Sequence, residues 1–303
     1  MLDDLPTPSK PAASPAPRVR RLAALINPLA HGVGPNAADT LARTAAEFGL
    51  PLHLVMPPPE ALRQASRDLV ASGPELLIVL AGDGTARSAA RLCGPGGPPV
   101  LLLPGGTMNI LPNALNGVRP WPDTLRLVLE GGVERWVAGG RVGGRPFYTA
   151  AVLGSPALLA PVREALRTMQ VAAAWKRARS AASRAFASLL RFESDGEPQR
   201  RTTGLGLICP HVSKALPDRA QALEAALLDQ RRITEVVRLG LYHLRGDWRA
   251  DPSVETTRVR RGRAWARRPI PAILDGESFR LERSVPIEFI PKAFRALVPP
   301  SFP

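Results

Sequence analysis

Two continuous apolar stretches of strand length, Leu76–Ala81 and Val100–Leu103, constrain the fold of this chain more than any other feature. Each is followed at once by a glycine-rich turn, and the first turn leads into a segment of helical composition. Runs that are apolar throughout are typical of strands buried on both faces of a parallel sheet. The sequence therefore predicts an open α/β sheet covered by helices.

Further segments continue this alternation along the first half of the chain. The predicted strands and helices are Val19–Ile26 (strand), Ala37–Gly49 (helix), Leu50–Met56 (strand), Glu60–Ser72 (helix) and Thr85–Leu92 (helix). Polar or glycine-rich turns follow three of the strands, at Asn27–Gly34, Gly82–Thr85 and Gly105–Asn109. Because ligands of open α/β sheets gather at the carboxyl ends of the strands, these three turns predict one binding site.

The pattern changes at about Val137. Short segments such as Arg145–Val152 and Thr203–Ile208 follow, and two stretches of helical composition, Val162–Leu190 and Ala220–Leu241, interrupt them. We therefore expect a second, mainly β domain with helical insertions.

Charge separates the two halves more sharply than hydrophobicity does. The 303 residues carry a formal net charge of +14, and the stretch from Arg141 to Arg268 alone carries +13. Such a surface favours a polyanionic partner, either an anionic membrane or nucleic acid. Two lone cysteines exclude a disulfide scaffold. No apolar run reaches the roughly 18–20 residues of a membrane-spanning helix, and the Pro- and Ser-rich residues 1–18 are typical of a disordered tail. The expectation is a cytoplasmic protein that contacts membranes peripherally.

Residues 82–85, Gly-Asp-Gly-Thr, combine phosphate-binding chemistry with a carboxylate. Backbone N–H groups of such a turn can approach phosphate oxygens, and a following helix adds its dipole. Asp83 would then serve a metal ion or the proton of a substrate hydroxyl, the alternative being a plain helix N-cap. Downstream, Asp275-Gly276-Glu277 places two carboxylates around a glycine, which suits either a proton acceptor or an ordinary hairpin turn. No P-loop or dinucleotide-binding motif is present.

The order of these motifs is more specific than any one of them. Asn27-Pro28, then Gly-Asp-Gly-Thr at 82–85, then Leu-Pro-Gly-Gly-Thr-Met-Asn at 103–109, then Asp-Gly-Glu at 275–277 resemble the soluble diacylglycerol kinase catalytic family, which includes bacterial lipid kinases and the sphingosine and ceramide kinases. The resemblance covers roughly residues 21–291.

The resemblance implies a phosphofructokinase-like α/β nucleotide domain and a β-sandwich lipid-binding domain with a cleft between them. The implied boundaries are 19–136, with 284–303 returning to this first domain, and 137–283 for the second. ATP and Mg²⁺ are the implied cofactors, and diacylglycerol or a related long-chain lipid is the implied acceptor. Glu277 would accept the proton of the lipid hydroxyl, with Asp275 and Asp83 close to the transferring phosphate. The residues expected to contact nucleotide are Asn27, Pro28, Gly82, Asp83, Gly84, Thr85, Gly106, Thr107 and Asn109.

Several positions depart from the family pattern. Ala81 replaces a glycine, Arg87-Ser88 replaces Asn-Glu, and Met56-Pro57 stands where a threonine is frequent. An Asp-Gly pair that supports a structural metal in the second domain is absent, which leaves Asp218 or Glu224 as substitutes and the metal ligands unknown.

Other functions remain open on the sequence. These departures also suit a non-catalytic lipid- or nucleotide-binding module, and the Gly-Asp-Gly-Thr turn is shared with NAD-kinase-like enzymes. A nucleic-acid partner is not expected. A homodimer is left open.

Overall fold

The computed structural model describes residues 21–159, 189–217, 220–229 and 248–300. The expected tail, most of the stretch 162–190, Asp218 and residues 230–241 of the second helical stretch lie outside these residues.

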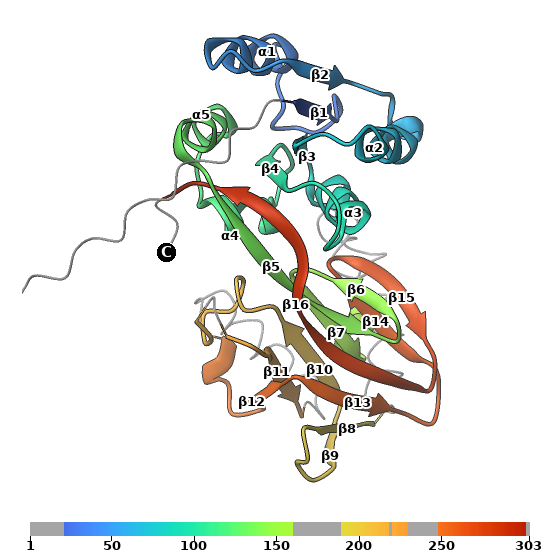
Figure 1. Ribbon diagram of the computed structural model, residues 1–303. Helices are drawn as coiled ribbons and strands as arrows, with labels where there is room; N and C mark the ends of the chain where they lie inside the picture. The colour runs from blue at the N-terminus through green and yellow to red at the C-terminus, as the bar shows by residue number, and fades with distance from the viewer. Residues whose placement is uncertain (1–20, 160–188, 218–219, 230–247, 301–303) are drawn as a thin grey trace, which may run out of the picture.

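The first part of the chain is a parallel sheet between two layers of helices (Figure 1). The strands β1 (Leu22–Ile26), β2 (Leu52–Val55), β3 (Leu76–Ala81) and β4 (Val100–Pro104) lie in the order β2-β1-β3-β4. The helices are α1 (Ala37–Glu47), the 3-10 turn Pro59–Ala61 with α2 (Leu62–Ala71), α3 (Asp83–Cys93), α4 (Ile110–Asn116) and α5 (Trp121–Gly131). The predicted α/β class is confirmed, and α4 and α5 are helices that the sequence pattern did not predict.

Alternate residues of each central strand face opposite helix layers. In β3, Leu77 and Val79 pack with α2, α3 and α4, whereas Ile78 and Leu80 pack with α1 and α5. All six residues of β3 are buried. This two-sided burial explains why the strand is apolar throughout.

The second part consists of antiparallel strands in two packed layers. One layer is a six-stranded sheet of described residues in the order β12-β11-β10-β7-β14-β15. Its strands are β7 (Ala150–Gly154), β10 (Gly204–Ile208), β11 (Leu223–Leu228), β12 (Val254–Val259), β14 (Ile270–Leu274) and β15 (Glu277–Leu281). The facing layer contains β5 (Val133–Val142), β6 (Arg145–Phe147), β8 (Leu190–Ser194), β9 (Arg200–Thr202), β13 (Arg261–Trp265) and β16 (Ser284–Val298). Short 3-10 turns lie at Ser155–Leu159 and Trp248–Ala250.

The two layers enclose a common apolar core. Phe147 of β6, Phe192 of β8 and Ile287 of β16 face Leu153 and Leu205 of the other sheet within it. Packing of two antiparallel sheets over such a core is the β-sandwich architecture expected for the second half.

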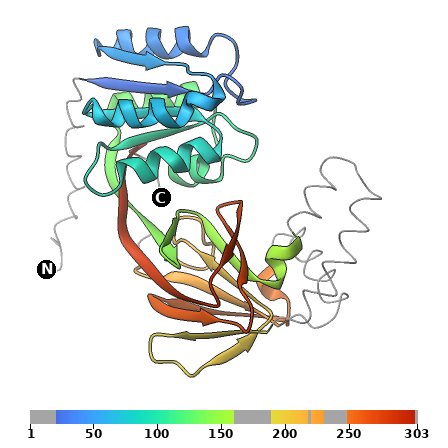
Figure 2. The same cartoon turned by 90° about the vertical axis from the view of Figure 1, so that its right-hand side faces the viewer.

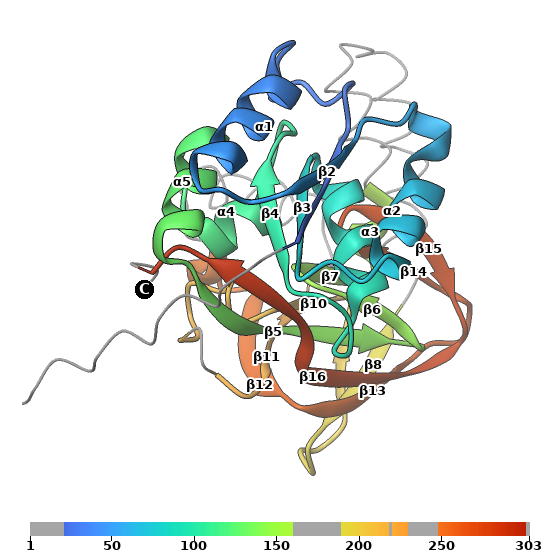
Figure 3. The same ribbon diagram turned by 45° about the horizontal axis from the view of Figure 1, so that its top comes forward.

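The long strand β16 joins the two parts into one sheet. Its first residues pair antiparallel with β13, its last pair parallel with β4 through Ala296 and Val100, and β5 runs along most of its length. The views show β16 and β5 passing together from the sandwich into the α/β part (Figures 2 and 3).

Two sequence-based expectations are wrong. The stretch from Ala220 was expected to be helical, but residues 223–228 form β11. The sequence Leu-Glu-Ala-Ala-Leu-Leu has high helix propensity, yet all six residues are buried between β10 and β12. Tertiary pairing overrides local propensity here. Likewise Leu190, the expected end of a helix, begins β8.

Within the described residues, no helix is both long enough and apolar enough to cross a membrane.

Candidate functional site

The three turns after β1, β3 and β4 are joined by backbone hydrogen bonds. Asn27 N donates to the Leu80 carbonyl, Gly105 N donates to the Ala81 carbonyl, and Gly32 N donates to the Gly105 carbonyl at 2.9 Å. Asn27 Oδ1 accepts from Leu29 N, which turns the first loop back on itself. The three predicted loops therefore form one surface at the carboxyl edge of the sheet.

A close backbone approach holds the second and third turns together. A Cβ added at Gly106 would lie 2.6 Å from Gly82 Cα, so only glycine fits there. Asn109, at a left-handed φ of 50°, closes the loop because its side chain bonds both the N–H and the carbonyl of Gly106. The Thr107 side chain is left exposed between them.

Asp83 is the first residue of α3, and Gly82 is the N-cap. Asp83 Oδ1 accepts a hydrogen bond from Leu111 N at 3.1 Å. The carboxylate therefore pairs with a backbone N–H in the first turn of α4, which has no partner within that helix, and not with an N–H of α3. The N-cap alternative for Asp83 is therefore wrong for α3. No hydrogen bond or ion pair of the other carboxylate oxygen, Oδ2, is found among the described residues.

Asp275-Gly276 forms the tight turn between β14 and β15, as the hairpin interpretation required. Both residues have positive φ, 47° and 90°, and Leu274 pairs with Glu277 across the turn. This is the pattern of a two-residue turn that suits the twist of a hairpin. The turn positions Glu277 at the start of β15.

The Asp275 carboxylate is used within the protein. It accepts hydrogen bonds from Tyr148 N, Thr149 N, Ala150 N and the Thr149 hydroxyl, at 2.6–3.1 Å, and its side chain is 3% exposed. These bonds fix the β14–β15 turn against the start of β7. The carboxylate predicted to lie near the transferring phosphate thus holds this turn in place.

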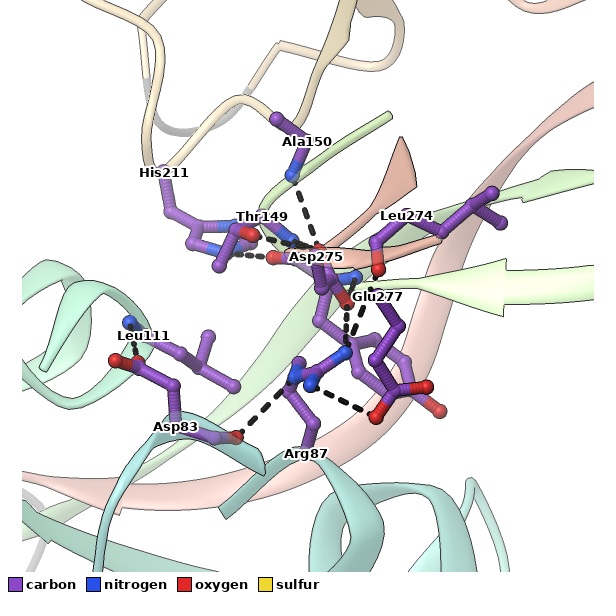
Figure 4. Close-up of polar contacts among 10 residues, drawn as sticks. Asp83, Arg87, Leu111, Thr149, Ala150, His211, Leu274, Asp275 and Glu277 are labelled. Atoms are coloured by element: carbon purple, nitrogen blue, oxygen red, sulfur yellow. Dashed lines mark hydrogen bonds and ion pairs between the residues drawn. The ribbon is translucent and has the colours of Figure 1, made fainter. Parts of the chain in front are cut away.

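Arg87 links the backbone of Asp83 to the carboxylate of Glu277 (Figure 4). One turn along α3, its Nε donates to the Asp83 carbonyl and its Nη2 donates to Glu277 Oε1 at 3.1 Å. Nη1 lies 3.5 Å from the Leu274 carbonyl and 4.0 Å from Asp275. The Arg87 side chain is 14% exposed, and that of Glu277 is 62% exposed. The sequence pattern flagged Arg87 as a departure, but its contact with Glu277 was missed because 190 residues separate the two.

A cavity of about 560 Å³ lies beside this ion pair. Helices α2 and α3, strand β6 with the residue after it, and the β14–β15 hairpin contribute its walls, and Gly84, Arg87, Tyr148 and Glu277 are among its lining residues. Burial raises the pKa of Tyr148 to about 12, so its phenol stays protonated at neutral pH. The volume falls in the range of small-molecule sites. Asn27 and Thr107 do not line it.

Glu224, the candidate metal ligand of the second domain, forms an ion pair with an arginine. Glu224 is 1% exposed, and Arg249 Nε and Nη2 contact its two carboxylate oxygens at 2.6 and 2.7 Å. Ser213 also donates to Oε2. A buried pair of this kind leaves no ligand position for a cation. Among the described residues, no cluster of three or more His, Cys, Asp or Glu side chains has metal-binding geometry.

The chain has a nucleotide-kinase-like fold. Its parallel sheet carries three turns that backbone hydrogen bonds join (the fused turns, at Asn27–Gly34, Gly82–Thr85 and Gly105–Asn109), and β16 connects this sheet to an antiparallel sandwich. Residues 21–139 match the family model described as the diacylglycerol kinase catalytic domain. Through this stretch, the chain is similar to the diacylglycerol kinase catalytic family. No curated protein sequence matches the chain.

Solved structures share the fold across nearly the whole chain. A putative diacylglycerol kinase from Bacillus anthracis str. Sterne is 16% identical with a TM-score of 0.71, and the match covers 94% of this chain and 99% of that one. A second Bacillus anthracis diacylglycerol kinase structure has the same coverage, at 14% identity and a TM-score of 0.68. An NAD kinase from Archaeoglobus fulgidus in complex with ATP is 12% identical, with a TM-score of 0.54 and coverage of 92% and 94%.

Proposed function

We propose that the protein is an ATP-dependent lipid kinase that phosphorylates the hydroxyl of diacylglycerol or a related long-chain lipid. The single observation that carries this proposal is the position of Glu277. An exposed carboxylate stands at a cavity, held by Arg87 one helical turn from Asp83 and next to the glycine turn 82–85. The family of the domain at 21–139 supports the kinase class.

In the proposed reaction, the lipid hydroxyl oxygen attacks the γ-phosphorus of ATP. The bond from that phosphorus to the bridging oxygen breaks, ADP leaves with the bond's electron pair, and Glu277 accepts the hydroxyl proton. Phosphoryl transfer depends mainly on positioning and charge stabilisation. The fused turns supply backbone N–H groups for the nucleotide phosphates, and Arg87 orients Glu277.

We assign the nucleotide lobe to residues 19–136 with the last part of β16 from Phe294, and the acceptor lobe to 137–283 with the first part of β16, whose Val285 and Ile287 lie in the sandwich core. Asn27, Pro28, the turn 82–85, Gly106, Thr107 and Asn109 would surround the nucleotide. Mg²⁺ is bound in kinases by one or two carboxylates plus substrate phosphates. The second oxygen of Asp83 suits that task, whereas the Asp275 carboxylate already accepts four hydrogen bonds within the protein. When bound, Mg²⁺ would neutralise phosphate charge.

The basic second half would hold the protein at the surface of an anionic membrane, on the cytoplasmic side. The charge of +13 between Arg141 and Arg268 supports this assignment.

The test is transfer of labelled phosphate from ATP to lipid vesicles. Glu277→Ala should lower kcat by about 10²-fold or more, because loss of a positioned proton acceptor typically costs that much. Asp83→Ala should lower kcat strongly as well, because it removes the carboxylate proposed to bind Mg²⁺. Glu282→Ala, which removes another exposed carboxylate near the end of β15, should leave kcat within twofold. Thermal unfolding of each variant checks that it is folded.

Wild-type rates in both variants would overturn the assignment of Glu277 and Asp83. Absence of transfer to any lipid, combined with ATP binding, would favour a non-catalytic binding module. Phosphorylation of NAD would favour an NAD-kinase-like activity. We include this test because the chain shares its fold with the Archaeoglobus enzyme.

A further inference from the structure

The cavity beside Glu277 is lined by an unusual excess of positive charge. Five of its lining residues are arginines, namely Arg63, Arg67, Arg87, Arg91 and Arg145, and two are carboxylates. One carboxylate, Glu277, is paired with Arg87, and the other, Asp275, already accepts four hydrogen bonds. The cavity therefore keeps a net charge of about three positive units near the proposed reacting hydroxyl.

Four of these arginines come from two neighbouring helices at helical spacing. Arg63 and Arg67 are four residues apart on α2, and Arg87 and Arg91 are four apart on α3. Like charges at this spacing destabilise a helix. Arg63, Arg67 and Arg91 are exposed and form no ion pair or hydrogen bond with any described residue that would offset this repulsion. An anion bound between the helices would offset it.

The opposite wall adds groups suited to the same ligand. The Arg145 guanidinium stacks over the Phe279 ring at 4.8 Å, which holds it at the cavity rim. The Tyr148 phenol, whose pKa burial raises to about 12, remains a neutral hydrogen-bond donor. Guanidinium groups bind phosphate oxygens in a bidentate manner, and clusters of them are the usual receptors for phosphate esters.

The cavity lies where the two parts of the chain meet, beside the proposed proton acceptor Glu277. Its walls include Leu274, Glu277 and Phe279 of the β14–β15 hairpin, whereas the loops at Asn27–Gly34 and Gly105–Asn109 contribute no lining residue. A neutral diacylglycerol headgroup would leave the arginines without a counter-charge. An acceptor with its own anionic group would supply one.

We propose that this arginine-lined cavity binds a phosphate or phosphodiester group carried by the acceptor itself, so that the substrate is an anionic hydroxyl compound. This inference rests on the proposed function, because it specifies the acceptor of the same site. A phospholipid headgroup and a free phosphate-bearing alcohol share the required chemistry.

Kinase assays with charge-matched vesicles test the proposal. Phosphatidylglycerol in phosphatidylcholine is a suitable probe, because its free hydroxyls lie within three carbons of the phosphodiester. The comparison acceptor is diacylglycerol, which is neutral. Its vesicles also contain phosphatidylserine, which has no free hydroxyl, in the amount that gives them the same surface charge as the phosphatidylglycerol vesicles. Soluble glycerophosphoglycerol is the third acceptor. We expect kcat/KM for phosphatidylglycerol to exceed that for diacylglycerol at least tenfold, and equal use of the glycerophosphoglycerol would assign the soluble source.

The double variant Arg63→Gln/Arg67→Gln should lower kcat/KM for the anionic acceptor at least tenfold. The control Arg21→Gln/Arg43→Gln removes the same net charge from the residue before β1 and from α1, both outside the basic stretch Arg141–Arg268, and should stay within twofold of wild type. ATP affinity, measured by calorimetry, should be unchanged in the double variant. A tenfold loss of ATP affinity would instead assign the cavity to the nucleotide and overturn the proposal.

Calorimetry with glycerophosphoglycerol separates the two proposals. In one outcome, the wild type binds glycerophosphoglycerol, Arg63→Gln/Arg67→Gln weakens this binding tenfold, and no phosphate is transferred to any acceptor. This outcome supports the anion site and overturns the kinase function. In the other outcome, the protein does not bind glycerophosphoglycerol, and it phosphorylates diacylglycerol at least as fast as phosphatidylglycerol. This outcome overturns the anion site and leaves the kinase function standing.

Discussion

Asp275 and Asp195 show how one local sequence takes two roles. Both occur in Asp-Gly-Glu and both turn a hairpin with positive φ at Asp and Gly. Asp195 is exposed and accepts from Arg260 N and Arg261 N. Asp275 is nearly buried and accepts four hydrogen bonds that fix β7 beside Glu277. The difference comes from what packs against the turn.

We expect Asp275→Asn to destabilise the protein by about 2–4 kcal/mol. Hydrogen bonds to a charged acceptor contribute roughly 1.5–3 kcal/mol, and the amide would turn an N–H group toward buried donors. Urea unfolding measures the loss. Asp195→Asn, the same change in an exposed turn with two donors, should cost less than about 1 kcal/mol. Equal losses in both variants would contradict the buried anchoring role.

At the scale of elements, the turns 82–85 and 105–109 act as one unit because their backbones touch. Gly106→Ala would place a Cβ 2.6 Å from Gly82 Cα, so one turn must move. We expect ATP affinity to fall at least tenfold, as measured by calorimetry. Gly96→Ala, where a Cβ meets nothing within 4 Å, should leave affinity unchanged. If Gly106→Ala binds ATP as the wild type does, the fused turns do not bind its phosphates.

The elements that the sequence predicted well are those whose environment is uniform. β3 matches its expected range of Leu76–Ala81 because both of its faces are buried. β11 was mistaken for a helix because its burial depends on two distant partner strands. The contact between Arg87 and Glu277 is likewise long-range. Local pattern therefore predicted the glycine turns, whereas the arginine that contacts Glu277 required the tertiary structure.

At the scale of the whole molecule, β16 ties the two parts together. Its Val285 and Ile287 belong to the sandwich core, whereas Phe294 and Ala296 belong to the core beneath α2 and α3. Phe294 is fully buried and meets the Tyr148 ring edge-on, with centroids 5.2 Å apart. A strand shared between cores should transmit loss of packing from one to the other.

Phe294→Ala should therefore lower the stability of both parts together. Truncation of a buried phenylalanine costs about 3–5 kcal/mol. Hydrogen exchange along a urea series should show peptides from β3 and β11 losing protection at one common, lowered midpoint. Phe289→Ala makes the same change at a half-buried position of β16 and should shift that midpoint less. Separate midpoints for β3 and β11 would contradict coupling through β16, and the cavity beside Glu277 would then lie between independently unfolding units.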